Sequence, residues 1–142
     1  MSGSPQQRRK SRRRALEFLF GIEFTGYEWE ETLETFWETF ETKQVVREYA
    51  KKLIGGVYKY VDVLDEHIDG ALTNWTPDRV GKIERNILRV AVYEIAYTDD
   101  VPVKVAMNEA IEIAKGYGSD ESAGFVNGVL DKLKSTTFAD VP

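Results

Sequence analysis

The sequence contains no cysteine and a single histidine among its 142 residues, so the residues that form disulfides and bind zinc are almost absent. Without cysteine there can be no disulfide and no thiolate metal centre. The histidine, His67, stands in the segment LDEHID, with carboxylates at positions 65, 66 and 69. Zinc sites use three or four well-placed protein ligands, so we expect no metal site here. His67 is instead expected to be a solvated or half-buried helix residue.

Long apolar runs and phosphate-binding glycine loops are also missing. No stretch approaches the roughly 18 to 20 apolar residues of a membrane span. The basic N-terminal segment lacks the apolar core and cleavage site of a secretory signal. A transit peptide is the alternative, although the segment lacks the serine-rich context of one. The segments GYG and LIGG do not have the spacing that cradles phosphate. We therefore expect a cytoplasmic protein that is not an enzyme, needs no cofactor and binds no membrane.

What the sequence does contain is apolar residues at helical spacing over most of its length. No stretch alternates with the period of two that is typical of a strand. The pattern predicts an all-α fold of six or seven helices with short links. Thr76 and Pro77 predict a helix start, and Gly55 and Gly56, in mid-helix, predict close helix packing. The apolar stripes lie within residues 16–24, 29–40, 45–72, 83–95, 103–114 and 125–133.

Charge is divided unevenly along the chain. The formal net charge is -5, yet residues 8–14 hold six of the 19 basic residues, and five of these six are arginine. The other 13 basic residues are set against 24 acidic ones, so the rest of the protein is strongly acidic. Such a segment favours RNA, DNA or an anionic membrane as its ligand. Arginine pairs with phosphate and stacks on exposed bases, which favours RNA, and a solvated tail is the alternative.

Residues 80–133 contain four distinctive segments in a fixed order, ERNILRVAVYE, DVP, NEAIEIAK and FVNGVLDK. They closely resemble the C-terminal half of the bacterial transcription antitermination factors of the NusB family. The arginine-rich start followed by ALEFLF is similar to the family's first helix, and residues 28–75 match in helical pattern more than in identity. The resemblance implies a compact bundle of about seven helices. The chain is expected to divide into a flexible arm at residues 1–10 and one domain at 11–142, and this domain into subdomains at about 11–75 and 76–138.

The same resemblance implies a function without catalysis. Proteins of this family pair with NusE, a small-subunit ribosomal protein, and bind the boxA element of nascent ribosomal RNA transcripts. They then join the RNA polymerase antitermination complex with other Nus factors. Three alternatives remain. The chain could be a non-catalytic helical adaptor or a ribosomal RNA maturation factor, each with an incidental basic arm. It could also be a fragment of a ribosomal RNA methyltransferase, although it contains no catalytic cysteine and no cofactor loop.

The resemblance also assigns roles to particular residues. Asn127 and Gly128 are expected to be structural, as a turn-facing amide and a close helix contact. Position 20 holds phenylalanine where the family is expected to have tyrosine, so a hydroxyl contact to the partner is lost there. The residues expected to bind RNA are Arg8, Arg9, Lys10, Arg12, Arg13, Glu121 and Phe125, the last two in the turn before the final helix. Those expected to contact NusE are Phe20, Asp78 and Glu84.

Overall fold

The computed structural model describes residues 3–22, 28–40, 43–73, 76–117 and 119–142, and it contains no strand in these ranges. The all-α class is confirmed, but the expected number of about seven helices is too high by one. The helix α3 continues as one element through a kink at Tyr60, and residues 77–79 form only a short 3-10 turn. The elements are α1 (Pro5–Phe20), α2 (Trp29–Thr39), α3 (Gln44–Gly70), η1 (Pro77–Arg79), α4 (Lys82–Tyr97), α5 (Val103–Tyr117) and α6 (Asp120–Ser135).

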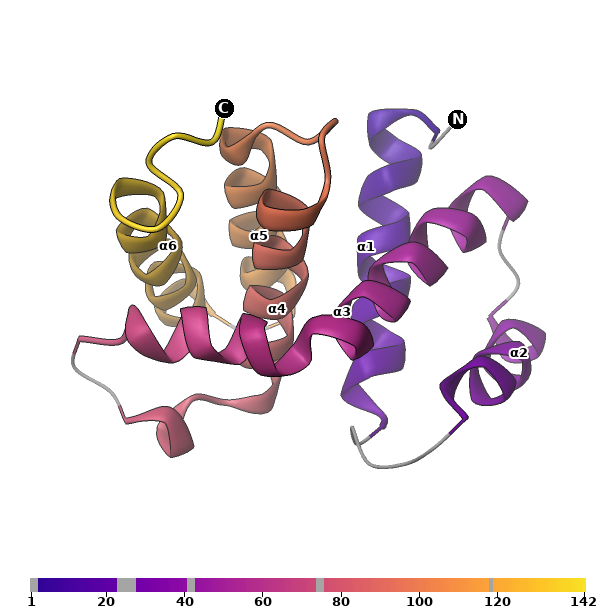
Figure 1. Ribbon diagram of the computed structural model, residues 1–142. Coiled ribbons are helices and arrows are strands. Elements are labelled where there is room, and N and C mark those ends of the chain that lie inside the picture. The colour runs from indigo at the N-terminus through magenta and orange to yellow at the C-terminus, as the bar shows by residue number, and fades with distance from the viewer. Residues whose placement is uncertain (1–2, 23–27, 41–42, 74–75, 118) are drawn as a thin grey trace.

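The helices form two groups that lie side by side. Figure 1 shows α1, α2 and the first half of α3 on one side, and α4, α5 and α6 on the other. The long helix α3 crosses from one group to the other, and it packs against both α1 and α4. The N-terminal end of α1 lies at the same end of the molecule as the C-terminus (Figure 1). The arginine-rich part of the chain is thereby placed beside the second group.

A hydrophobic cluster of buried side chains runs through both groups. Two glycines of α3 allow close contacts in it, as the sequence predicted. A Cβ atom on Gly56 would lie 2.1 Å from the ring of Tyr93, and one on Gly55 would lie 3.2 Å from Trp29. The expectation of a close helix contact at Gly128 in α6 is wrong. A Cβ on Gly128 would meet nothing within 4 Å, and Asn127, expected to be a turn-facing amide, is exposed on the helix.

The arginine-rich segment is helical rather than flexible from residue 5 onward. The Ser4 hydroxyl accepts a hydrogen bond from the backbone N–H of Gln7, and the Gln7 side chain accepts one from the N–H of Ser4. This capping box satisfies two backbone donors, and Pro5 occupies the first helical position. The expected flexible arm at residues 1–10 is therefore corrected for residues 5–10, while residues 1 and 2 lie outside the described ranges.

Other local expectations are resolved as follows. Thr76 occupies the N-cap position of η1 without a capping hydrogen bond from its side chain, and Pro77 is the first residue of η1, but α4 begins only at Lys82. His67 is half-buried in α3, and its ring packs edge-on against Phe138 with 5.4 Å between the centroids, as expected of a helix residue.

In the described ranges, no group of three or more potential ligand side chains could hold a metal ion. Over the same residues, none of the helices combines the length and the apolar character needed to cross a membrane.

Candidate nucleic-acid and partner interface

Helical geometry sorts the six cations of residues 8–14 into three pairs. Side chains four positions apart lie on the same side of a helix. Arg12 stands four positions before Leu16, which is buried, so its side of α1 points toward the core. The other sides carry the exposed cations. The pairs are Arg8 with Arg12 on the core side, Arg9 with Arg13, and Lys10 with Arg14. Within the last pair, Arg14 is only 21% exposed and pairs with Glu17 at 2.8 Å.

Arg12 is a buried anchor of α1. Its side chain is 4% exposed, and its Nε donates to both carboxylate oxygens of Glu94 in α4, at 2.9 and 3.1 Å. The Tyr49 hydroxyl of α3 donates to the same carboxylate. Burial alone would lower the pKa of Arg12, but the hydrogen bond and the charge of Glu94 raise it. The expectation that Arg12 holds an RNA phosphate is therefore wrong, because a buried guanidinium paired with an acid does not reach solvent.

Arg8 and Arg9 are each paired with an acid outside α1. The Arg8 guanidinium binds Asp100, which precedes α5, and lies over the Tyr49 ring at 4.4 Å from its centroid. Arg9 donates through Nε and Nη2 to the two oxygens of Glu109 in α5, at 3.0 and 2.9 Å. The hydrogen bond from Arg9 lowers the pKa of Glu109, and the hydrogen bond from Arg8 lowers that of Asp100. Both cations are thus engaged by carboxylates.

An open groove of about 500 Å³ lies between α1 and α5. Lys10 and Arg13 line it, are exposed, and make no ion pair with the described residues. At one end, Tyr117 donates a hydrogen bond to Glu17 at 2.9 Å, and burial together with this carboxylate raises the pKa of Tyr117 to about 12. Arg9 and Arg14 complete the cationic part of the lining. A groove of this kind suits a phosphate backbone, because several cations face solvent along one edge.

A second, smaller groove of about 290 Å³ lies where η1 and the start of α4 meet the start of α6. It is lined by Glu84, Glu121 and Phe125, so one predicted partner residue lies beside two predicted RNA residues. Glu84 accepts a hydrogen bond from the Ser122 hydroxyl. Glu121 and Phe125 lie in the first two turns of α6, not in the turn before it, because Ser119 already caps that helix. The ring of Phe125 is half-buried.

The other two predicted partner residues lie apart from each other. Phe20, the last residue of α1, is half-buried, and its ring packs edge-on against Tyr117 with 5.6 Å between the centroids. Phe20 therefore borders the first groove. Asp78 is exposed in η1, where a hydrogen bond from Thr76 lowers its pKa. It lies in the turn next to the second groove, which Arg79 helps to line.

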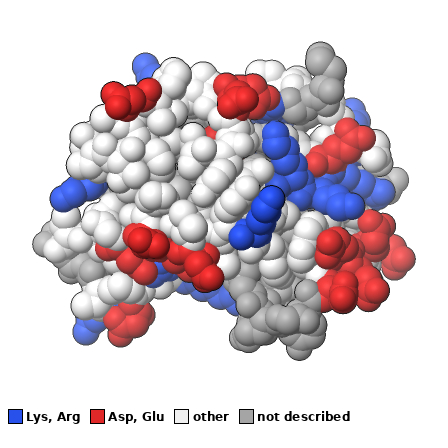
Figure 2. Space-filling model, in the orientation of Figure 1, with Lys and Arg blue, Asp and Glu red and all other residues white. Residues whose placement is uncertain are grey.

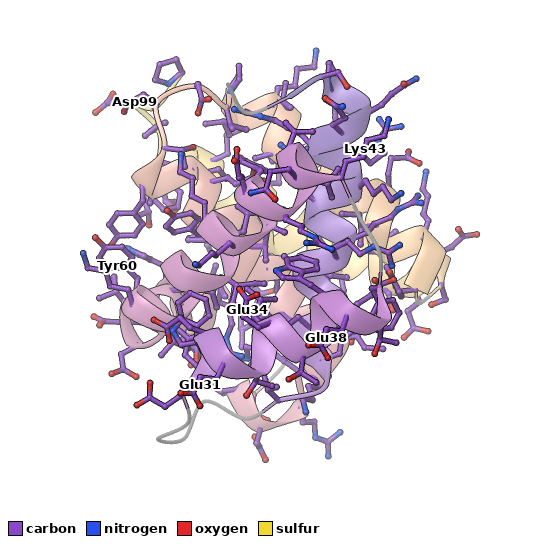
Figure 3. The ribbon with its side chains drawn as sticks, turned by 90° about the vertical axis from the view of Figure 1, so that its right-hand side faces the viewer. Glu31, Glu34, Glu38, Lys43, Tyr60 and Asp99 are labelled. Carbon is purple, nitrogen blue, oxygen red and sulfur yellow. The ribbon has the colours of Figure 1, made fainter. Side chains whose placement is uncertain are left out.

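Acidic side chains gather on α2, away from both grooves. Figure 2 shows a dense acidic patch at the end of the molecule where α2 lies. Glu31, Glu34 and Glu38 project from this helix toward the viewer in Figure 3. They are exposed and make no ion pair with any residue that the structure describes. This acidic patch would repel RNA and thereby favours the α1 edge as the nucleic-acid surface.

Sequence reasoning missed the acids that pair with the arginine segment. Glu94, Asp100 and Glu109 stand far from α1 in sequence, and no local pattern links them to it. It also missed Tyr117, Arg79 and Ser122 as neighbours of the predicted site residues. The one available signal was the spacing of Arg12 from Leu16, since both share the side of the helix that continues into the core.

Comparisons with known proteins agree with this architecture. The family model described as the NusB family matches residues 9–135. A protein of Anaeromyxobacter sp. (strain Fw109-5) named transcription antitermination protein NusB is 47% identical over 128 residues, which cover 89% of each chain. The solved T. maritima NusB is 34% identical, with a TM-score of 0.78 and 91% of each chain covered.

A further solved structure contains the antitermination factors NusB and NusE in complex with dsRNA. Its similar chain is 26% identical, with a TM-score of 0.80, covering 93% of this chain and 98% of that one. Sequence and structure thus match over almost the full length. The chain belongs to the NusB family.

Proposed function

We propose that the protein is an RNA-binding transcription antitermination factor. With NusE it binds boxA of nascent ribosomal RNA transcripts, and it joins the RNA polymerase antitermination complex with other Nus factors. Two findings support the proposal. The similar Anaeromyxobacter protein is named for transcription antitermination, and a similar solved NusB is described together with NusE and dsRNA. Such a factor works in the cytoplasm, needs no cofactor, carries out no catalysis and does not bind membranes.

The observation that carries the proposal is the exposed pair Lys10 and Arg13 in the groove between α1 and α5. Neither forms an ion pair within the described residues, so both can take an RNA phosphate without first breaking a contact. Arg9 stands beside them and is half exposed, at 51% of its side chain. We assign the phosphates to these three cations. We assign an unpaired base to Phe125 in the second groove, with Glu121 at its rim.

NusE is assigned to an acidic surface that includes Asp78 and Glu84, with Phe20 as a further contact near the first groove. A basic ribosomal protein suits such a surface. By covering acidic side chains it reduces their repulsion of RNA and adds its own cations to the RNA path. RNA and NusE should therefore bind with positive and reciprocal coupling, typically about 1 to 3 kcal/mol.

The test is a titration of boxA-containing RNA with wild type and with the double variant Lys10→Ala, Arg13→Ala, each with and without NusE. The variant should bind RNA more weakly, and the slope of log affinity against log salt should fall by up to about 0.7 per lost phosphate contact. The double variant Lys51→Ala, Lys134→Ala is the matched loss of two positive charges, at exposed positions of α3 and α6, and should change little. An unchanged salt slope in the double variant would remove the groove as the RNA surface.

The alternatives are a helical adaptor or a ribosomal RNA maturation factor with an incidental basic segment. An adaptor would keep its protein partners when Lys10 and Arg13 are replaced and would show no preference for boxA. Deletion of residues 1–14 is a poor test of this alternative, because Ser11 and Arg12 are buried and α1 would lose its anchor. We further propose that the chain forms the two subdomains of the family, at about residues 11–75 and 76–138, and that α3 of the first packs against α4 of the second.

A further inference from the structure

Two cations of α1 are occupied by acids of the same chain: Arg9, which lines the proposed RNA groove, and Arg8, which lies outside its lining and is 13% exposed. Arg8 binds Asp100 through Nη2 and Oδ2, and Arg9 binds both oxygens of Glu109 through Nε and Nη2. We propose that Asp100 and Glu109 determine RNA selectivity by competing with phosphate for Arg8 and Arg9. This inference rests on the proposed RNA-binding function and adds two residues and a mechanism of discrimination to it.

The competition follows from the geometry of the arginine side chain. A guanidinium presents a planar pair of N–H donors that fits a carboxylate and a phosphate in the same bidentate manner. In the Arg9–Glu109 pair, these donors already point at the two carboxylate oxygens. A phosphate can bind this side of Arg9 only if the hydrogen bonds from Arg9 to Glu109 break. The hydrogen bond from Arg9 lowers the pKa of Glu109, so the acid is charged at neutral pH and competes fully.

Each acid can release its arginine without becoming a buried, unpaired charge. Glu109 also lies 3.3 Å from Nη1 of Arg12, which Glu94 holds in place, so Glu109 keeps a positive neighbour after Arg9 turns to a phosphate. Asp100 is 53% exposed and would be solvated by water when Arg8 leaves it. An acid left buried and unpaired would make the exchange too costly. Both pairs are therefore suited to reversible exchange rather than to a permanent lock.

The consequence is discrimination between RNAs. An RNA held only by its phosphates gains little from Arg8 and Arg9, because each new contact replaces an existing ion pair. Lys10 and Arg13 alone then supply the weak, non-selective attraction. An RNA that also places a base on Phe125 and contacts NusE is held beside α1, where its phosphates are at high effective concentration. Such an RNA displaces the acids, and the preference for it over other RNAs increases.

The structure offers a matched control for each acid. Glu112 lies three residues after Glu109 on α5 and pairs at 3.6 Å with Lys115; its charge acts on Arg9, but it forms no ion pair with it. Asp99 is the exposed neighbour of Asp100 and is labelled in Figure 3. Glu109→Gln and Glu112→Gln remove the same charge from the same helix. Asp100→Asn and Asp99→Asn do so at adjacent positions of one loop.

The experiment measures binding of full-length variants to boxA-containing RNA and to a scrambled RNA of equal length, over a range of salt. Glu109→Gln and Asp100→Asn should raise affinity for the scrambled RNA by about two- to fivefold, the size of one partly exposed ion pair. They should raise boxA affinity less, so that selectivity falls. The salt slope should steepen by up to about 0.7 for each released arginine. The control variants should affect both RNAs equally and by less than about twofold.

Three outcomes would overturn the inference. Equal effects of Glu109→Gln and Glu112→Gln would mean that only overall charge matters. A loss of RNA affinity in a variant with wild-type melting behaviour would mean that the acids hold the arginines in place for RNA. Absence of RNA binding by wild type in the presence of NusE would defeat the proposed function itself, and this inference with it. Asp100→Asn tests the idea separately at an exposed side chain, should Glu109→Gln fold poorly.

Discussion

Arg12 of α1 and Glu94 of α4 form an ion pair in the interior, in which Nε of Arg12 donates a bifurcated hydrogen bond to the two carboxylate oxygens at 2.9 and 3.1 Å. The side chains are 4% and 1% exposed, and Tyr49 of α3 also donates to the carboxylate. One buried acid therefore joins three helices. The pair holds the orientation of α1 about its own axis, and that orientation decides which of the neighbouring cations face solvent.

Arg12→Met should destabilise the fold strongly. It leaves Glu94 buried with the Tyr49 hydroxyl but without a cation, and breaking a buried ion pair in this way costs about 3 to 5 kcal/mol of unfolding free energy. Urea unfolding monitored by circular dichroism measures the loss. The double variant Arg12→Met, Glu94→Leu should recover much of it, because no buried charge remains. A single variant as stable as wild type would contradict the assigned anchoring role.

Phe125 should contribute to RNA affinity through its ring. Phe125→Leu keeps an apolar side chain against the core but offers no stacking surface, so RNA affinity should fall by about 1 to 3 kcal/mol. The melting temperature of the variant should stay near that of wild type. Fluorescence anisotropy with labelled RNA measures the RNA affinity, and calorimetry measures the melting temperature. A variant with a clearly lower melting temperature and normal RNA affinity would assign Phe125 to the core alone.

Two glycine-to-alanine substitutions should act in opposite directions. A Cβ on Gly56 would overlap the Tyr93 ring at 2.1 Å, so Gly56→Ala should force α3 and α4 apart and cost about 1 to 3 kcal/mol. The site of Gly128 on α6 is open, so Gly128→Ala should stabilise the helix by up to about 1 kcal/mol. Thermal unfolding of both variants gives the signs. Similar effects at the two positions would contradict the described packing of α3 on α4.

The Arg9–Glu109 pair should make stability depend on acid pH. The folded pKa of Glu109 lies below its ordinary value of 4.5, chiefly because Arg9 donates to it. Its contribution is therefore complete above that ordinary value and is lost as pH falls through the lower folded value. Because the pair is partly exposed, the contribution should be below about 1 kcal/mol. Urea unfolding at several pH values should show wild type and Glu109→Gln converging as the pH falls below 4.5, and divergence there would contradict the assignment.

Charge reversal at the proposed NusE surface should separate partner binding from RNA binding. Asp78→Lys with Glu84→Lys should weaken NusE binding, because a basic protein loses two acidic contacts and meets two cations. RNA affinity without NusE should hold or rise, since two repulsive charges are gone. Titrations of wild type and variant, each with and without NusE, measure both effects. Equal RNA affinity of wild type in the presence and absence of NusE would overturn the cooperative mechanism.

Most of the fold was predictable because its determinants are local. Apolar residues at helical spacing placed six helices, and the resemblance of residues 80–133 to one family assigned the second group of helices. The expectations that failed concern positions whose surroundings lie far away in sequence. Gly128 was expected to pack closely because glycine in a helix usually has a reason, yet no element lies over it. Asn127 was expected to be a turn-facing amide, but it is exposed on α6, seven residues after that helix begins at Asp120.

For the candidate site, the sequence alone determined that a dense row of cations would stand on the first helix of an acidic protein. Composition and order suffice for that, since they do not depend on packing. Only the tertiary structure decided which of these cations can meet RNA. The acids that bury Arg12 and engage Arg8 and Arg9 lie 82, 92 and 100 residues away. Packing of α1 against α4 brings these acids to the arginines. Lys10 and Arg13 remain exposed because neither forms an ion pair within the described residues, although the charge of Arg13 still contributes to lowering the pKa of Glu109.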